Sequence, residues 1–297
     1  MMLRRRGLLR SPSRSAVPEG ASVDMPQSSI RLPDHDPQAP SLLVDQLSAN
    51  YNGNAALRDV SFRLPAGRRL AVVGPNGAGK TTLFNVIAGT KRPSAGSVRI
   101  FGHGPGGDTC IAYVPQRSLI DWAFPVTAAE VVMMGRVREI GLVRWPRRHD
   151  WEIVREALDR VGLADLAGRS IGELSGGQQQ RVFLAQALAQ QAELILLDEP
   201  FTGLDFPSLE ALFSILDELR AGGVTELIAT HDLNLAAERF DTVMLVNRRL
   251  IAYGPPASVL TRANLVQAYG GHVHVLPEGD GVLVLTDTCC EGDEAGV

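Results

Sequence analysis

The sequence predicts an α/β fold with a largely parallel sheet at its centre and a separate lobe of helices. Short apolar runs, which suit strands buried on both faces, alternate with stretches that have helical spacing. A mostly helical block from Thr127 to about Leu166 interrupts this alternation, so it should form the separate lobe. No internal repeat is visible, which indicates one copy of the module in the 297 residues.

The predicted elements are justified in chain order by apolar runs and by helical spacing. Strands are predicted at 42–51, 56–64, 68–74, 96–102, 108–116, 193–200 and 225–232. Helices are predicted from Lys80 to Gly89 and from about Ser208 to Arg220. The stretch 241–254 has the pattern of a hairpin that turns around Asn247-Arg248-Arg249.

The two ends of the chain differ in composition from the main domain, 41–258. Residues 1–40 are rich in Arg, Ser and Pro and cannot bury a core, so we expect a disordered tail. A basic tail of this kind can contact anionic lipid or nucleic acid, although a solvated extension is the more ordinary interpretation. Residues 259–297 are expected to form a C-terminal extension.

The composition argues against several classes of protein. The net charge of -4 gives no electrostatic reason to expect a nucleic-acid partner. No apolar run reaches about 18 residues and no export-type apolar core follows the first arginines, so we expect neither a membrane span nor an export signal. Cys110, Cys289 and Cys290 are expected to be free thiols, because adjacent cysteines rarely form a disulfide and no Cys-x-x-Cys is present.

The stretch GPNGAGKT, residues 74–81, carries the clearest chemical signal. It fits the pattern Gly, four residues, Gly-Lys-Ser/Thr, and it lies between a predicted strand and a predicted helix, where that pattern binds phosphate. Gly77 and Gly79 leave backbone N–H groups free to surround phosphate oxygens, and the helix dipole points at the same anion. We expect Lys80 to reach the β- and γ-phosphates and the Thr81 hydroxyl to ligate Mg²⁺.

A second apolar strand, in LILLDEP at 194–200, ends in two carboxylates. Ligands of open α/β sheets lie at the carboxyl ends of the strands, so these side chains should face the phosphate loop. We expect Asp198 to hold Mg²⁺ through water and Glu199 to accept a proton from the attacking water or to orient it. His231 ends another apolar strand at the same edge, where it would hydrogen-bond the γ-phosphate and keep the water and Glu199 in register.

The stretch LSGGQQQRVFLAQAL, residues 174–188, is not explained by hydrolysis alone. Ser175, Gly176 and Gly177 precede a helix of good helix formers that continues from Gln178. A hydroxyl and bare backbone N–H groups at a helix start form another anion site. The chain therefore has two phosphate-binding devices about a hundred residues apart.

In type and order, these motifs resemble those of the nucleotide-binding subunit of ATP-binding cassette (ABC) transporters, over residues 42 to about 258. In this resemblance GPNGAGKT corresponds to Walker A, Gln116 to the Q-loop, LSGGQ to the signature motif, LILLDEP to Walker B, 203–205 to the D-loop and His231 to the H-loop. The resemblance implies a RecA-like P-loop NTPase with a mostly parallel sheet, an antiparallel β subdomain and an α-helical subdomain inserted at about 117–175.

The resemblance also implies a set of site residues and two cofactors, ATP and Mg²⁺. Glu199, His231 and Gln116 would be catalytic, and Mg²⁺ would be held by Thr81, Gln116 and Asp198. The residues that would contact ATP include Tyr51, whose ring would stack on adenine. The full set is Tyr51, Gly74, Pro75, Asn76, Gly77, Ala78, Gly79, Lys80, Thr81, Thr82, Ser175, Gly176, Gly177, Gln178 and Asp205.

The same resemblance accounts for the two anion sites and supplies partners. Two copies would pair head to tail, so that each ATP lies between the phosphate loop of one copy and Ser175 of the other. Two integral membrane permease subunits would each insert a short helix into a groove by the Q-loop, near Gln116–Phe124. The protein would then act at the cytoplasmic face of the cell membrane.

The stretches 115–136 and 254–276 resemble one subfamily of these ATPases. Its members energise the import of manganese, zinc or related divalent ions, which an extracytoplasmic metal-binding protein delivers. Two environments remain open for Trp122 and Phe124, the core of the helical lobe and the permease-docking groove. The turn at Pro125 and the use of aromatic residues as anchors in grooves favour the groove.

Other functions remain open from the sequence. The ATPase could serve an importer of iron chelates or vitamin B12, or an exporter. A soluble ABC protein that acts on ribosomes or DNA is disfavoured, because no stretch between Gln116 and Leu174 is long enough for a coiled coil. His272 and His274 lack a third ligand and suit an edge strand, and no role follows for Cys289 and Cys290.

Overall fold

The helices and strands follow the predicted alternation. A computed structural model gives the structure, which describes residues 39–51, 53–104, 111–116, 124–141, 143–270, 273–278 and 281–286. The strands are β1 (Leu42–Tyr51), β2 (Asn54–Leu64), β3 (Arg69–Val73), β4 (Ala95–Ile100), β5 (Ile111–Val114), β6 (Leu194–Asp198), β7 (Thr225–Thr230), β8 (Thr242–Asn247), β9 (Arg249–Gly254), β10 (Val273–Glu278) and β11 (Gly281–Thr286). The helices are α1 (Lys80–Ile87), α2 (Ala128–Met134), α3 (Val137–Ile140), α4 (Arg148–Arg160), α5 (Gly176–Ala189), α6 (Phe206–Ala221), α7 (Leu233–Arg239), α8 (Pro256–Val259) and α9 (Arg262–Tyr269), with short 3₁₀ turns at Ala164–Leu166 and Ile171–Glu173.

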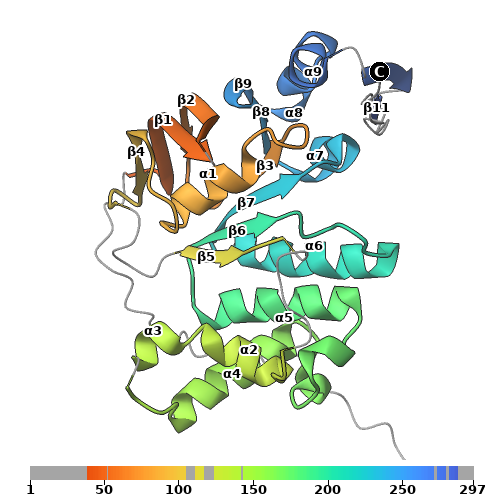
Figure 1. Ribbon diagram of the computed structural model, residues 1–297. Coiled ribbons are helices and arrows are strands. Elements are labelled where there is room, and N and C mark those ends of the chain that lie inside the picture. The colour runs from red at the N-terminus through yellow and green to blue at the C-terminus, as the bar shows by residue number, and fades with distance from the viewer. Residues whose placement is uncertain are drawn as a thin grey trace, which may run out of the picture. The chain divides into compact units, whose positions relative to one another are not determined.

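The central sheet of the described residues has six strands in the order β5-β6-β7-β3-β8-β9 (Figure 1). The pairs from β5 to β8 are parallel, and β9 returns antiparallel to β8 through a turn at Arg248. A separate antiparallel sheet has the order β2-β1-β4, and β10 pairs with β11. The expected α/β class, with a mostly parallel sheet and an antiparallel β part, is confirmed.

Two hydrophobic cores lie on the two faces of the central sheet. Alternate residues of a strand point to opposite faces, and β3 shows this division. Leu70 and Val72 join the core that contains α1 and the antiparallel sheet, whereas Ala71 and Val73 join the core formed with the helical lobe. All five residues of β3 are buried, which explains why the strand is a continuous apolar run after Arg69.

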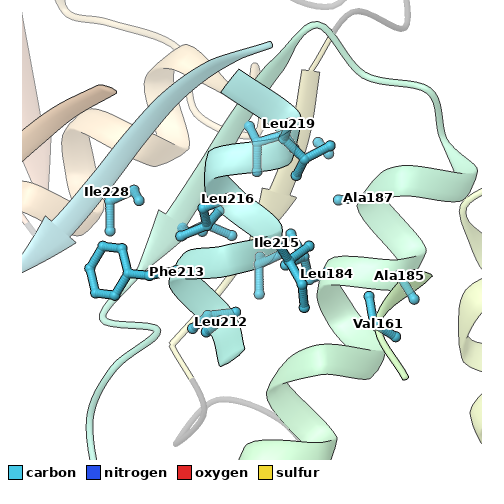
Figure 2. Close-up of a cluster of buried hydrophobic side chains, with 14 of the residues drawn as sticks. Val161, Leu184, Ala185, Ala187, Leu212, Phe213, Ile215, Leu216, Leu219 and Ile228 are labelled. Atoms are coloured by element: carbon cyan, nitrogen blue, oxygen red, sulfur yellow. The ribbon is translucent and has the colours of Figure 1, made fainter. Parts of the chain in front are cut away.

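The core on the helical side is formed mainly by α5, α6 and the strands above them. Figure 2 shows Ile215 of α6 beside Leu184 of α5, while Phe213 of α6 lies beside Ile228 of β7. The Phe213 ring stacks on Phe201 at 4.8 Å between centroids. This packing fixes α6 and the chain after β6 relative to the sheet.

The helical lobe consists of α2, α4 and α5 packed against one another. Thr127 and Glu130 form a capping box at the start of α2, which explains where the helical block begins. A Cβ atom at Gly135 would lie 2.4 Å from the Gln186 carbonyl oxygen of α5, so glycine permits this close approach. Because α5 also packs on β5 and α6, the lobe and the sheet share this helix.

Several residues singled out in the sequence lie outside the described residues. They are the tail 1–38, Cys110, Trp122, His272, Cys289 and Cys290. His274 lies in β10.

A buried ion pair joins the starts of the neighbouring parallel strands β3 and β7. Arg69 of β3 donates to Glu226 of β7, its register neighbour; the two residues are 2% and 0% exposed. Arg69 also contacts Asp217 of α6 at 2.9 Å, and its guanidinium lies 5.6 Å from the centroid of Phe213. Burial raises the pKa of Glu226 to about 7, and Arg69 opposes this rise.

We predict that Arg69→Ala lowers the free energy of unfolding by about 3–5 kcal/mol at about pH 8, because the buried Glu226 carboxyl must then stay charged without this partner or take up a proton. Urea unfolding measures this loss. The double variant Arg69→Met with Glu226→Leu should recover most of it, since both charges are then removed. A double variant as unstable as Arg69→Ala would contradict this account.

Candidate nucleotide site

Four neighbouring parallel strands bring the predicted motifs to one edge of the sheet. The phosphate loop follows β3, Gln116 follows β5, Asp198 and Glu199 end β6, and His231 follows β7. These strands are adjacent in the order β5-β6-β7-β3, so residues from distant parts of the sequence meet.

The phosphate loop is held closely on both sides by backbone. A Cβ atom at Gly74 would lie 2.0 Å from the Val246 carbonyl oxygen, at the end of β8. A Cβ atom at Gly79, whose φ is 98°, would lie 2.6 Å from the Ala56 carbonyl oxygen of β2. Gly77, with φ 74°, meets nothing within 4 Å. Glycine is therefore required at the flanks for packing, and the tip of the loop is left open for a ligand.

Lys80 begins α1 and is buried, with 6% exposure. Its Nζ donates to the Gly74 carbonyl oxygen at 2.7 Å and to that of Pro75 at 3.3 Å, and it lies 4.0 Å from Glu199 Oε1. Burial lowers the pKa of Lys80, whereas the Glu199 and Asp198 carboxylates act in the opposite direction. The ammonium thus lies inside the curve of the loop, where a phosphate group would meet it.

Glu199 lies at the centre of the assembled group. Its Oε2 accepts a hydrogen bond from Gln116 Nε2 at 3.2 Å and lies 3.7 Å from His231 Nδ1. The Glu199 backbone has a φ of 51°, which is uncommon for a non-glycine residue, and its N–H donates to the Ala229 carbonyl oxygen at 3.0 Å. Backbone strain of this kind is concentrated at functional sites.

Asp198 is the residue whose surroundings fit a metal ion. It is 3% exposed, and its Oδ2 is buried without a hydrogen-bond partner. Burial raises the pKa of Asp198, while a hydrogen bond with the Thr81 side chain lowers it. Buried carboxylate oxygens usually have a partner, so an unpaired one beside a hydroxyl fits a Mg²⁺ ligand set, which consists of oxygens.

The second predicted anion site lies at the start of α5. The Ser175 hydroxyl accepts from the Gln178 N–H at 3.3 Å, and the Gln178 side chain accepts from the Ser175 N–H at 2.8 Å, forming a capping box. A Cβ atom at Gly177 would lie 2.5 Å from Ser208 Oγ in the first turn of α6. Asp205 caps α6 by accepting from the Ser208 N–H. The first turn of α5 therefore packs beside Asp205.

The two aromatic residues of interest that the structure describes are accessible. Tyr51, at the end of β1, is 58% exposed, and Lys91 Nζ lies 5.0 Å from the centroid of its ring. Phe124 is 56% exposed and therefore lies outside the core of the helical lobe. Of the two environments considered for Phe124, the core is excluded.

Two contacts of the site were not anticipated from the sequence. Tyr113 of β5 is partly buried near Asp198; desolvation, with a smaller effect of that carboxylate, raises its pKa. The pairing of β5 with β6 would have suggested this neighbour. The N–H of Arg248, in the β8–β9 turn, donates to the Ala78 carbonyl oxygen at 2.9 Å. The sequence predicted this turn but gave no signal that it contacts the phosphate loop.

The fold and the grouped residues define a phosphate-loop ATPase. The family described as ABC transporter matches residues 57–202. The chain belongs to the ABC transporter family, as an ATP-binding subunit that hydrolyses ATP. Such subunits dimerise and work with membrane permease subunits.

The similar proteins include ATP-binding subunits of metal transport systems. The manganese transport system ATP-binding protein MntB of Bacillus subtilis is 42% identical over 79% of this chain and 94% of its own length. The zinc transport system ATP-binding protein TroB of Treponema pallidum is 43% identical over 80% and 90%. The chelated iron transport system membrane protein YfeB of Yersinia pestis is 46% identical over 78% and 80%.

Solved structures share the fold over most of the chain. An inward-facing ABC transporter described as metal-chelate type matches with a TM-score of 0.71 and 29% identity, covering 82% of this chain and 96% of its own. The ATP-binding cassette MJ1267 in its ADP conformation matches with a TM-score of 0.69 and 26% identity, covering 78% and 99%. Within the described residues, no helix has the length and apolar character needed to span a membrane.

We predict that Lys80→Ala weakens ATP binding by about 10- to 100-fold, because it removes a charge-assisted hydrogen bond to phosphate. Lys80→Arg should also bind weakly, since a guanidinium is larger than the ammonium that fits between the loop carbonyls. Titration of the purified protein with ATP measures both affinities. Wild-type affinity in Lys80→Ala would refute this role.

Proposed function

We propose that this protein energises the import of divalent metal ions such as manganese, zinc or iron, by binding and hydrolysing ATP at paired sites. The observation that carries the chemistry is the grouping of Lys80, Gln116 and His231 around Glu199. The metal substrate is supported by the names of the similar transport proteins. The metal itself would not touch this subunit.

In the proposed reaction, Glu199 accepts a proton from the water that attacks the γ-phosphate. Gln116 and His231 contact the same carboxylate, so they orient it and the water between them. Lys80 would exchange its loop-carbonyl partners for oxygens of the β- and γ-phosphates, and the remaining loop residues from Gly74 to Thr82 would enclose the phosphates.

Thr81 and Asp198, together with Gln116, would hold Mg²⁺ in this site. The unpaired Asp198 oxygen supports this assignment. When bound, Mg²⁺ would neutralise charge on the phosphate oxygens. Tyr51 is exposed at the end of β1 and would stack on the adenine.

The second half of each ATP site would come from a second copy of the chain. Ser175, Gly176, Gly177 and Gln178 would bind the γ-phosphate of an ATP held by the phosphate loop of the other copy. Asp205 packs beside that helix start and would reach the interface with it. A head-to-tail C2 pair contains two such composite sites, and bound ATP stabilises it because ATP forms part of the interface.

We propose that two integral membrane permease subunits dock near Gln116 and Phe124, which places the protein at the cytoplasmic face of the cell membrane. The exposure of Phe124 supports this surface, since aromatic residues are frequent anchors in docking grooves. Gln116 contacts Glu199 and so would link the groove to hydrolysis. An extracytoplasmic metal-binding protein would deliver the ion to the permease.

We predict that Glu199→Gln slows ATP hydrolysis by roughly 10²- to 10⁴-fold, because the amide cannot accept the proton of water. ATP binding should persist, and the variant should form a dimer with ATP and Mg²⁺. Size-exclusion chromatography with light scattering measures the assembly. The double variant Glu199→Gln with Ser175→Arg is the control, and it should stay monomeric. A Glu199→Gln protein that is monomeric under the same conditions would count against the composite site.

The substrate is tested by reconstitution with the permease and the binding protein encoded beside this subunit. We predict that one of Mn²⁺, Zn²⁺ or iron stimulates ATP hydrolysis in proteoliposomes, because the loaded binding protein biases the transporter towards its active state. The Glu199→Gln complex is the control for contaminating ATPases. If no metal stimulates hydrolysis while basal ATPase persists, the metal substrate is wrong and the ATPase assignment stands.

A further inference from the structure

The turn between β8 and β9 contacts the phosphate loop through backbone hydrogen bonds. The Arg248 N–H donates to the Ala78 carbonyl oxygen at 2.9 Å, and the Arg248 carbonyl oxygen accepts from the Arg58 N–H at 2.7 Å. Arg248 has a φ of 58°, so the turn holds a left-handed conformation at a non-glycine residue. The end of β8 also packs against Gly74, where a Cβ atom would lie 2.0 Å from the Val246 carbonyl oxygen. The position of this turn therefore affects the position of the loop.

Asn247 connects the same turn to the C-terminal extension. Its Nδ2 donates to the Ala268 carbonyl oxygen at 2.8 Å, in the last turn of α9. The last carbonyl groups of a helix have no partner within the helix, so a side-chain amide that reaches one satisfies an otherwise unmet acceptor. Helix α9 also packs on β8 and β9, which lie together in Figure 1.

An open pocket of about 660 Å³ lies beside the tip of the phosphate loop and the end of α9. Its lining consists of Pro75, Asn76 and Gly77 of the loop, Asn247 and Arg248 of the turn, and residues 267–270. Within this lining, the hydrogen bonds of Asn247 and Arg248 connect α9 to the phosphate loop.

We propose that Asn247 is a positioning residue for ATP binding, through which α9 of the C-terminal extension holds the phosphate loop in its binding conformation. The Asn247 side chain hydrogen-bonds the Ala268 carbonyl of α9, and the next peptide N–H, that of Arg248, hydrogen-bonds the Ala78 carbonyl of the phosphate loop. Asn247 does not touch the nucleotide. Its loss should lower ATP affinity while leaving the chemical step largely unchanged, because Glu199, Gln116 and His231 are positioned by β6, β5 and β7 rather than by the turn after β8.

The test uses Asn247→Asp in the full chain. The substitution preserves size and turn preference but replaces the donor with an acceptor that faces the Ala268 carbonyl. The KM for ATP should rise by about 2- to 10-fold, which corresponds to the net contribution of one hydrogen bond, and kcat should change by less than about twofold. Hydrogen exchange of the Arg248 amide should become faster, and this readout is independent of activity.

Asn264→Ala is the matched control. Asn264 Nδ2 donates to the Val259 carbonyl oxygen at 2.9 Å, so its loss removes a similar bond from the same extension without contact to the turn. We expect it to lower the melting temperature as Asn247→Asp does and to leave the KM for ATP unchanged.

The outcomes separate this inference from the proposed function, on which it rests through the binding of ATP by the phosphate loop. Equal KM changes in both variants, or a wild-type KM in Asn247→Asp, would overturn the positioning role. Absence of ATP binding by the wild-type chain would instead count against the proposed function.

Discussion

The parallel pairing of β3, β6 and β7 is the constraint on which the rest of the structure depends. Parallel strands end at one edge, so the phosphate loop, the Walker B carboxylates and His231 meet there although they are far apart in sequence. At the opposite end of the same strands, Arg69 and Glu226 join β3 to β7. A shift in the register of these strands would separate Arg69 from Glu226 at one end of the sheet. At the other end it would move the residues grouped around Glu199 apart.

The phosphate loop shows why some glycines could be interpreted from the sequence and others only from the structure. The motif indicated that Gly77 and Gly79 clear space for phosphate, and Gly77 does face open space. Gly79 and Gly74 instead allow β2 and β8 to approach the loop, with neighbouring carbonyl oxygens at 2.6 and 2.0 Å from the added Cβ positions. Such contacts join segments that are far apart in the chain, so the sequence around Gly74 and Gly79 carries no pattern that predicts them.

The positions of the strands along the chain, the start of the helical lobe and the meeting of polar residues at one sheet edge were predictable because each has a local signal. Apolar runs marked the strands, the change to helical spacing marked the start of the lobe at Thr127, and polar residues at strand ends marked the edge. The environment of Tyr113 and the contact of Arg248 with the phosphate loop depend instead on which strands are neighbours. The exposure of Phe124 likewise required the packing of the whole lobe.

The placement of the second anion site explains how ATP can control assembly in the proposed dimer. Ser175 caps α5, which packs on α2, α4 and α6, whereas Lys80 begins α1 on the opposite face of the sheet. Gln116 follows β5, against which α5 also packs, and it contacts Glu199. A shift of the helical lobe would therefore move Ser175 relative to the second copy and disturb the Gln116–Glu199 bond together. A permease that docks at this lobe would thus affect both the closure of the dimer, through Ser175, and the position of Glu199, through Gln116.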